Sequence, residues 1–445
     1  MAIPGLSDSL LLSLGQVRKA YPTISYQGID VSQTFQPSLV DFVYKEGFGD
    51  QQMADTLEIT LADPEGLFRK SWSLSTGQTV SASIVVENWN GPGTGTLTKP
   101  LGSMFIKSVR ISQNKGSGTT VRISCTSINP SIGFRLEKKS RPWNQTTVQA
   151  VAAQIATDNQ LTLNAPPDAA SKQMDRVDQH DHSDAYMLKK ICSENDYSYK
   201  VVNGVLWIRD RHVVEQSASV GTIVCPSPQT GPGGLNGSGV ENWEFIETTE
   251  DANYSEADAK YKDPVTGNRV SGTATDPNQT GGGTTTPISP VQTPTAKAVP
   301  TLQPNPGPKL VYIYNPHDGA MRSTEGIVTQ SITGQGPSLT VPDANKSLPD
   351  KQTTKTDPGT ETNAAVTEKA KLVALSKLRQ KNRKGNEFII TFPILTTLES
   401  GTVYSLNGFT PDGDSGQWVL VDCVLSFKGK SGSTTKCTFQ KALTF

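Results

Sequence analysis

The chain has 445 residues, of which 35% are hydrophobic, and its 41 Lys and Arg against 42 Asp and Glu leave a formal net charge of −1. The length predicts two to four domains rather than one core, and the plentiful Gly (39) and Pro (29) predict that part of the chain is linker. A net charge near zero argues against a nucleic-acid partner held by bulk electrostatics, because phosphate binding requires a basic surplus.

The five cysteines are far apart and show no CxxC spacing, which argues against a zinc ribbon or a thioredoxin-type redox pair. Their odd number and the lack of a secretory signal favour a reducing compartment. We predict no disulfide, because the candidate cysteines are expected on separate strands and modules. The apolar run at Ser9–Leu14 is too short to span a bilayer, and no basic segment precedes it. We therefore expect residues 1–20 to form an arm or a short helix, and we expect no stable membrane insertion.

The next part of the chain has the pattern of β-strands. From Thr56 to Leu61 polar and apolar residues alternate, which gives a strand one apolar and one polar face, and the strand ends in the turn Asp63–Gly66. Further strands are expected at 23–29, 35–44, 78–87, 104–112 and 119–126, the last two joined by a Gly/Ser turn. Short strands with glycine-rich turns predict a first β-barrel over residues 21–139, completed by strands from 213–239.

After Arg141 the pattern becomes helical. Apolar residues at helical spacing predict a helix over 146–158 with Asn159 as its C-cap. Ser183–Asp184 marks the start of a second helix, and Asn203–Gly204 between two apolar runs predicts a hairpin. Residues 140–212 are expected to form a small inserted α+β module.

Strands resume after Val240 and predict a second β-barrel over 240–271 and 364–445. Its expected strands are 243–248, 257–262, 387–392, 402–407, 417–427 and 434–440, with an Ala/Lys-rich helix at 364–383. Residues 272–363 form a linker-rich insertion with a short strand near 310–314. Within it, 272–308 and 337–363 are rich in Thr, Pro, Gly and Ser and are predicted to lack regular structure, because they bury too little apolar surface to offset the entropy of ordering.

Two segments, 108–125 and 422–439, share one layout. Each has a long alternating strand, a Lys/Gly/Ser turn, a Thr-Thr pair and a return strand, and each follows a glycine and an aromatic residue. Gly/Ser hairpins are common, so chance similarity is the alternative, but the preceding strands match as well and favour a duplication. Three chains with two similar barrels each would present six similar modules to a six-fold partner.

Many short motifs carry a further resemblance along nearly the whole chain. They are Asp50, Asp55–Leu61, Asp63–Gly66, Gly77, Leu101–Gly102, Phe105, Arg135–Leu136, Lys139–Ser140, Trp143, Ser183–Asp184, Leu188, Tyr197, Trp243, Tyr254–Ser255, Tyr261 and Gly416–Trp418. In this order and spacing they resemble the late-control D family, the baseplate hub proteins of bacteriophage tails, which are similar in fold to the hub part of type VI secretion spikes. The Pro/Thr linkers depart from the family's compact pattern.

The resemblance implies a mainly β fold with an α+β insertion and two similar tail-tube-like β-barrels in one chain. It also implies a structural hub of a contractile tail or related injection machine, a homotrimeric, pseudo-six-fold ring around a central channel. Implied partners are the tail tube or distal tail protein ring, the central spike and the tape measure protein, with DNA only passing through the bore. The implied location is the virion tail, assembled in the host bacterial cytoplasm.

One cluster has metal-ligand residue types, the stretch Asp178–Asp184 with His180 and His182. The two histidines with a carboxylate have the chemistry to bind a divalent ion. The alternative, which we favour, is an exposed polar loop with Ser183 or Asp184 as the helix cap. We expect no metal, cofactor or catalytic residue.

No nucleophile elbow, HExxH or P-loop motif is present, and Gly91–Gly95 has no Lys-Ser/Thr behind it. The basic run Lys138–Arg141 is typical of a solvated face, with a DNA-lining role as the alternative. A glycosidase needs only two carboxylates. The functions left open beside a structural hub are therefore a tail-associated peptidoglycan hydrolase and a host-surface adhesin.

Overall fold

The chain is described from a computed structural model. The described residues are 18–49, 53–70, 72, 74–89, 95–116, 118–130, 132–226, 239–248, 254–262, 269–278, 309–314, 321–323, 328–329, 338–339, 360–410, 416–429 and 432–445. Residues 1–17 of the N-terminal arm predicted over residues 1–20 and most of the two predicted linkers lie outside these residues, and the last two residues of the predicted arm, Lys19 and Ala20, are in a strand. Contacts divide the chain into a first unit (Met1–Ser193, Tyr197–Ile246, Asn386–Thr444) and a second (Glu194–Asp196, Glu247–Gly385, Phe445).

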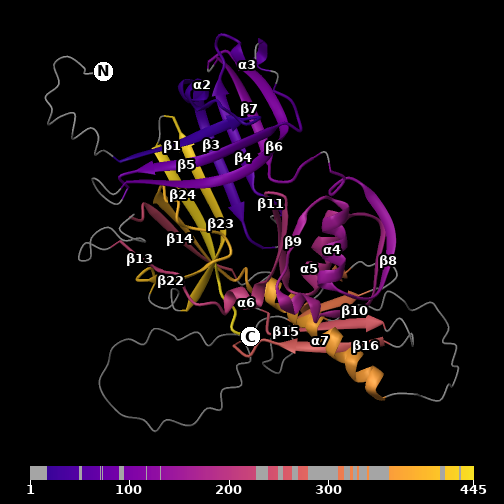
Figure 1. Cartoon of the computed structure of the whole chain (residues 1–445). Coiled ribbons are helices and arrows are strands. Elements are labelled where there is room, and N and C mark those ends of the chain that lie inside the picture. The colour runs from indigo at the N-terminus through magenta and orange to yellow at the C-terminus, as the bar shows by residue number, and fades with distance from the viewer. Residues whose placement is uncertain are drawn as a thin grey trace, which may run out of the picture. The chain divides into compact units, whose positions relative to one another are not determined.

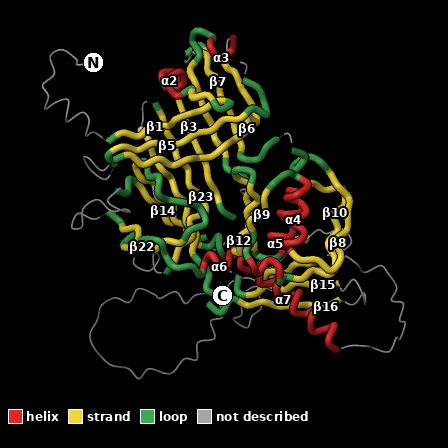
Figure 2. Tube along the Cα trace, in the orientation of Figure 1, coloured by secondary structure: helices red, strands yellow, loops and turns green. Residues whose placement is uncertain are grey.

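The first unit contains a 13-stranded sheet, which we call the main sheet (Figures 1 and 2). Its first half consists of β1 (Lys19–Tyr26), β2 (Ile29–Asp30), β3 (Leu39–Gly47), β4 (Thr56–Ala62), β5 (Thr79–Glu87), β6 (Thr96–Asn114) and β7 (Gly118–Thr126). Its second half consists of β13 (Thr222–Val224), β14 (Asn242–Glu247), β21 (Asn386–Pro393), β22 (Val403–Asn407), β23 (Gln417–Lys428) and β24 (Gly432–Lys441). The mainly β fold expected from the alternating pattern is confirmed.

The two halves of the main sheet repeat one topology. Neighbouring strands run β5–β6–β7–β4–β3 in the first half and β22–β23–β24–β21–β14 in the second. Taken in chain order, β3 to β7 therefore correspond one by one to β14 and β21 to β24. This is the strand-level repeat that the sequence predicts.

The hairpins of the two halves also share their register. In β6–β7, Ser108 lies opposite Ser124, directly after a bulge that follows Ile106. In β23–β24, Asp422 lies opposite Thr438, directly after a bulge that follows Leu420. Corresponding residues of the two hairpins are separated by the same number of positions, 314 from Ser108 to Asp422 (422 − 108) and 314 from Ser124 to Thr438 (438 − 124). Matching strand order, register and bulge support the duplication over chance similarity.

The halves are joined by β3 and β23, which pair antiparallel from Asp41–Lys428 to Gly47–Asp422, and Figure 1 shows indigo β3 beside yellow β23. Buried side chains of both halves form one hydrophobic cluster, which includes Leu57 of β4 and Phe388 of β21. Strand β13 pairs in parallel with β22. The prediction that strands from 213–239 complete the first barrel is therefore wrong, because the edge that β13 extends belongs to the second half.

The inserted module has its own core. It contains β8 (Lys138–Thr147), α4 (Val148–Asp158), β9 (Thr162–Asn164), the 3₁₀ helix η2 (Pro167–Ala170), β10 (Gln173–Ser183), α5 (Asp184–Glu194), β11 (Tyr197–Val202), β12 (Val205–Asp210) and α6 (Arg211–Glu215). The apolar stripes of α4 and α5 meet buried residues of β11 and β12. Both predicted helices, the Asn159 cap and the hairpin are confirmed, and Asn203 and Gly204 both have the positive φ of a tight hairpin turn.

The second unit pairs a sheet with one long helix. The sheet contains β15 (Glu256–Lys262), β16 (Arg269–Thr275), β17 (Lys309–Tyr314) and β18 (Met321–Ser323), the helix is α7 (Thr360–Asn382), and β19 (Val328–Thr329) pairs with β20 (Ser338–Leu339). Buried Ala257 and Ala259 of β15 form a core with Ala374 and Leu378 of α7. The three alanines are small enough to let α7 lie close to β15, and the shared core shows that both elements belong to one unit.

Three predictions about this part of the chain are corrected. Residues 256–271 and the 364–383 helix were expected in the second barrel, but they belong to the second unit instead. The predicted linker 272–308 begins inside β16, and the predicted linker 337–363 includes β20 and the first turn of α7. The strand expected near 310–314 is confirmed as β17.

The strand predicted at 35–44 begins later than expected. Residues 32–38 form the helix α2 (Ser32–Phe35) and the 3₁₀ helix η1 (Gln36–Ser38), with a proline in the first turn of η1. A further short helix, α3, covers Leu67–Lys70. No helix in the described part of the chain is both long and apolar enough to cross a membrane.

Candidate functional site

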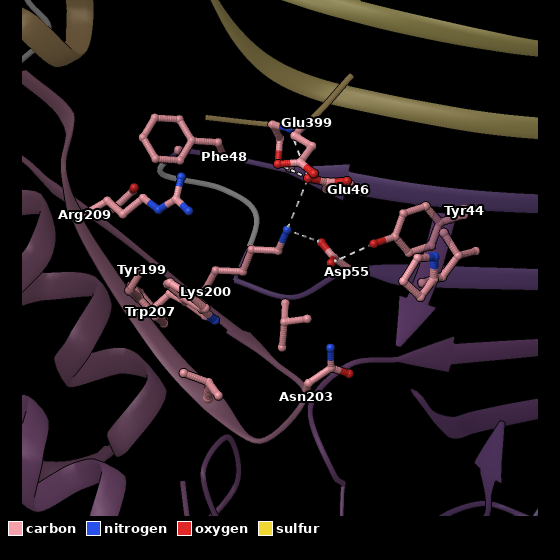
Figure 3. A pocket seen from close by; sticks show the side chains of 18 of the residues that line it. Tyr44, Glu46, Phe48, Asp55, Tyr199, Lys200, Asn203, Trp207, Arg209 and Glu399 are labelled. Carbon is pink, nitrogen blue, oxygen red and sulfur yellow. Dashed lines mark hydrogen bonds and ion pairs between the residues drawn. The ribbon is translucent and has the colours of Figure 1, made fainter. Parts of the chain in front are cut away.

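A pocket of about 510 Å³ opens in the first unit between the main sheet and the β11–β12 hairpin (Figure 3). Its walls come from β3, the start of β4, the middle of β6, the hairpin, and the loop before β22. Charged side chains gather on one wall, where Figure 3 shows Lys200 pointing between Glu46 and Asp55. We call these residues, together with Lys99 and Tyr44, the pocket cluster.

Both carboxylates of the pocket cluster continue apolar rows of the core. On β3, Phe42, Tyr44 and Glu46 alternate with more exposed residues and are all buried. On β4, the buried row Leu57, Ile59 and Leu61 extends backwards to Asp55, which is 2% exposed. Since side chains two residues apart share one face of a strand, each row leads an acidic group to the border of the core.

Glu46 is held by two lysines and one loop. Its carboxylate lies 3.4 Å from Lys99 Nζ and 3.9 Å from Lys200 Nζ. It also accepts hydrogen bonds from the backbone N (3.0 Å) and Oγ (2.8 Å) of Ser400. Lys99 Nζ in turn donates to the carbonyl of Leu398 at 2.7 Å. The cluster thereby ties the two halves of the main sheet together, because Lys99 is on β6 and residues 398–400 precede β22.

Asp55 links the sheet to the hairpin. Its Oδ1 lies 2.7 Å from Lys200 Nζ on β11, and its Oδ2 accepts a hydrogen bond from the Tyr44 hydroxyl at 2.9 Å. Ser127 Oγ accepts from the backbone N of Asp55 at 3.0 Å and donates to the carbonyl of Val201. Three strands are thus joined through one aspartate.

The environments of the two carboxylates move their pKa values in opposite directions. Burial raises the pKa of Glu46, but the charges of Lys99 and Lys200 and the hydrogen bonds from Ser400 outweigh it, so the pKa is lowered. Burial dominates at Asp55 and raises its pKa despite Lys200 and Tyr44. Burial and the neighbouring Asp55 raise the pKa of the Tyr44 hydroxyl far above its usual range. Two lysines against two carboxylates leave the cluster close to neutral.

The sequence-predicted metal candidates lie elsewhere. His180 and His182 belong to β10, which pairs with β8, so the prediction of a polar loop over 178–184 is wrong. A bulge between Gln179 and His182 interrupts the pairing, with Asp181 at φ 53°, and His182 stacks on Tyr186 with ring centroids 4.0 Å apart. Among the residues that the structure describes, no group of three or more His, Cys, Asp or Glu is placed to hold a metal ion.

Asp184 has a larger role than the predicted helix cap. It is 1% exposed, and its carboxylate lies 2.7 Å from Lys139 Nζ and 2.9 Å from Arg141 Nη2. Asn159 and Gln179 donate two more hydrogen bonds to it. Burial raises the pKa of Asp184, but these four donors outweigh it and lower the pKa. Ser183 Oγ caps α5 by accepting from Tyr186 N.

This cluster changes the interpretation of the basic run Lys138–Arg141. Lys139 and Arg141, two residues apart on β8, point to one side and neutralise Asp184, while Lys138 on the other side pairs with exposed Asp181. The run is therefore not wholly a solvated face, because Lys139 and Arg141 hold a buried carboxylate while Lys138 lies on the exposed side.

Glu46, Lys99 and Lys200 were not predicted as site residues from the sequence. A signal for Glu46 is present in the sequence, because an acidic residue occupies the next same-face position after Phe42 and Tyr44. No comparable signal marks the lysines. Lys200 lies 145 residues after Asp55 in the chain, and only the docking of the hairpin brings the two together.

Comparison with known proteins identifies the fold. No protein-family model matches the chain, and no curated protein sequence matches it. The 43 kDa tail protein of prophage MuSo2 from Shewanella oneidensis aligns with a TM-score of 0.55 at 9% identity, covering 95% of this chain and 98% of that one. The tail protein from Neisseria meningitidis MC58 aligns with a TM-score of 0.53 at 13% identity, covering 95% and 96%.

A third similar structure is the E. coli c3393 protein, described as a component of the type VI secretion system, with a TM-score of 0.44 at 8% identity over 94% of this chain and 76% of that one. The conclusion on the fold rests on the first two structures, which match nearly end to end. This chain has the fold of phage tail proteins, as the resemblance in its sequence predicts.

Proposed function

We propose that this chain is the structural hub of a phage tail or related injection machine. It forms a homotrimer whose six similar halves surround a central channel, and it adapts the six-fold tail tube or distal tail ring to the three-fold spike. The tape measure protein and the DNA pass through or end at this channel, so the protein belongs to the virion tail and works by assembly rather than by catalysis.

One observation carries the proposal: the two halves of the main sheet repeat strand order, hairpin register and bulge in a chain with a phage tail protein fold. Two equivalent modules in one chain make equivalent contacts with neighbours, and a closed ring satisfies all of them. Three chains then supply six equivalent modules to a six-fold ring. The inserted module and the second unit occur once per chain, so they keep the three-fold symmetry that a spike needs.

The test is reconstitution. The purified chain is mixed with the tail-tube and spike proteins of the same phage, and the products are separated by size-exclusion chromatography with light scattering and imaged by electron microscopy. We expect a complex with three copies of this chain between the two partners. A monomer or dimer that joins neither partner would overturn the proposal.

The pocket cluster favours peptidoglycan hydrolysis as a second candidate. Glu46 and Asp55 line one pocket and their pKa values move apart, which is how enzymes separate a general acid from a base. Against it, Lys200 lies near both carboxylates and pairs directly with Asp55. To test this, peptidoglycan is incubated separately with the wild-type protein, with the pocket variants Glu46→Gln and Asp55→Asn, and with Glu58→Gln, which changes an exposed carboxylate and serves as the control. Soluble fragments released by the wild type and the control but by neither pocket variant would establish the hydrolase and defeat the non-catalytic role.

A further inference from the structure

The hairpin strands β6 and β23 correspond, but their neighbours differ. The segment Asp422–Lys428 of β23 is bonded on one side to β24 and on the other to β3. The corresponding segment of β6, Ser108–Asn114, is bonded on one side to β7, whereas the pairing of β5 with β6 ends at Phe105. Within the described residues, one edge of Ser108–Asn114 therefore has no strand beside it.

A second open edge lies at the other end of the main sheet. Strand β14 lies next to β21 in the second half, as β3 lies next to β4 in the first half, so β14 and β3 hold equivalent positions. Strand β3 has a neighbour on each side, but β14 is the last strand of the sheet, so among the described residues its outer edge is unpaired. Each chain thus has two open edges among its described residues, one on β6, the counterpart of β23, and one on β14, the counterpart of β3. Inside the chain, β3 and β23 pair with each other.

Side-chain contacts align β14 with β3. Tyr44 lies opposite Leu57 on β4. Leu57 and Phe388 correspond, because they pair with Cys125 and Phe439, which differ by 314 residues. Phe245 of β14 stacks on Phe388 with centroids 4.7 Å apart. Phe245 therefore corresponds to Tyr44, and Trp243, two residues earlier, corresponds to Phe42.

Apolar residues on the two open edges are exposed where their counterparts are buried. Leu425 of β23 is 0% exposed under β3, but the corresponding Ile111 of β6 is 50% exposed. Phe42 is 0% exposed and packs edge-on against Phe427, but its counterpart Trp243 is 36% exposed. Both exposed residues lack the cover that the β3–β23 pairing supplies inside the chain.

The two edges also carry opposite charge. Residues 107–115 contain three basic residues, Lys107, Arg110 and Lys115, and no acidic residue. Residues 241–248 contain three acidic residues, Glu241, Glu244 and Glu247, and no basic residue. Opposite charges across paired strands favour the pairing and its register.

We propose that β14 of one chain pairs antiparallel with Ser108–Asn114 of β6 in a second copy of the chain, in the register of β3 with β23. Ile111 then lies opposite Phe245 of the neighbouring copy, and Gln113 opposite its Trp243. This inference rests on the proposed hub and specifies which edges join its subunits. The contact is head-to-tail, and a closed ring of such contacts leaves neither of these two edges open.

Cysteine pairing tests the register. Gln113→Cys and Trp243→Cys are made in separate chains and mixed, with tube and spike proteins added if assembly needs them. Directly opposed strand residues have Cα atoms about 4.5–5.5 Å apart, within the range of a disulfide. We expect a cross-linked dimer on a non-reducing gel only in the mixture. Ser112→Cys mixed with Trp243→Cys is the matched control, because Ser112 faces the opposite side of β6, and it should remain monomeric.

A second pair of variants tests the edge itself. Ile111→Asp should weaken self-association by about tenfold or more, while Leu97→Asp, an equally exposed apolar residue on the β5-paired part of the same strand, should not. Circular dichroism confirms that both variants fold. A stable trimer in which Gln113→Cys and Trp243→Cys chains form no cross-link, or one indifferent to Ile111→Asp, would overturn the edge pairing and leave the hub standing. Failure to self-associate even with tube and spike proteins would overturn both.

Discussion

The two hairpins of the main sheet show how one local structure acquires two different environments. β6–β7 and β23–β24 share register, bulge and turn length. Yet the second half of β23 is buried between β24 and β3, whereas the corresponding part of β6 is largely exposed. The composition follows the environment only in part: buried Phe427 of β23 corresponds to the polar Gln113 of β6, whereas buried Leu425 corresponds to the apolar but exposed Ile111.

The duplication therefore preserved the strand pairings within each half, but the two halves differ in whether a described strand lies beside the outer edge of their hairpin. One junction, β3 with β23, is satisfied inside the chain. The equivalent junction between β14 and β6 is not satisfied by any described residue of the chain.

We expect the largest difference in unfolding free energy when aspartate is introduced at corresponding positions of the two hairpins. Leu425→Asp buries a charge and removes a core side chain, and should lower the free energy of unfolding by about 4 kcal/mol or more. Ile111→Asp should change it by less than about 0.5 kcal/mol at concentrations where the chain is monomeric. Urea unfolding of both variants measures these two changes in unfolding free energy. Equal losses would mean that the two hairpins are equally covered in the single chain.

Removal of the Glu46 charge tests the cluster that joins the halves. Glu46→Gln leaves Lys99 buried without its nearest counter-charge and should cost about 3 kcal/mol near pH 7. The matched control Glu58→Gln removes an exposed pair with Arg122 and should cost less than about 1 kcal/mol. Chemical denaturation at neutral pH gives both values.

The same variant has a defined pH dependence. Because the pKa of Glu46 is lower in the folded chain than its usual 4.5, its stabilisation is complete above pH 4.5 and is lost as the pH falls through the folded value. The difference between wild type and Glu46→Gln should therefore shrink as the pH falls below 4.5. A difference that stays constant or grows in acid would show that charge is not the source of the stabilisation.

Two corresponding glycines lie ahead of the hairpin bulges, Gly102 within β6 and Gly416 directly before β23. Gly102 (φ 78°) and Gly416 (φ 96°) differ by 314 residues and both have a left-handed backbone, so alanine at either should cost about 1–2 kcal/mol. At Gly102 the added Cβ also lies 2.2 Å from Asn203 Oδ1, whereas at Gly416 the nearest atom is Lys441 Cε at 4.0 Å. Gly102→Ala should therefore cost more. Thermal unfolding with and without Asn203→Gly tests this, because the second change should relieve only the Gly102 variant.

The smallest effect concerns thiol reactivity. Burial raises the pKa of Cys125 to about 12, while Cys225 is partly exposed. At pH 8 the thiolate fraction of Cys125 is reduced roughly a thousandfold from that at its usual pKa. Mass spectrometry after brief alkylation should find label at Cys225 first. Early label at Cys125 would indicate that the first half of the sheet opens more readily than its register suggests.

Much of the fold was predictable from local patterns. Alternation located β4, β5, β7 and β23, helical spacing located α4 and α5, and Asn203–Gly204 located a hairpin turn. The repeat of 108–125 in 422–439 predicted the matched hairpins down to their turns. These features are readable because periodicity, caps and turns depend on residues that are neighbours in the chain.

The errors arose where partners are distant in the chain. Strands β8 and β10 were missed because their faces are polar, and they are held by Asp184 with Lys139 and Arg141. Not every unpredicted contact is distant in the chain: Cys423 and Cys437, on the two strands of one hairpin, lie directly opposite each other with Sγ atoms 3.9 Å apart and form no disulfide.

Most strands of the main sheet, the existence of the inserted module and the duplication could be read from the sequence, because each rests on local period or on direct similarity. Only the tertiary structure decided that the halves share one sheet and one core, that β15, β16 and α7 form a separate unit, and that Glu46, Asp55, Lys99 and Lys200 meet. These features depend on contacts between residues that are tens to hundreds of positions apart in the chain. Alternation specifies which face of a strand is covered, but it does not specify which strand covers its edge.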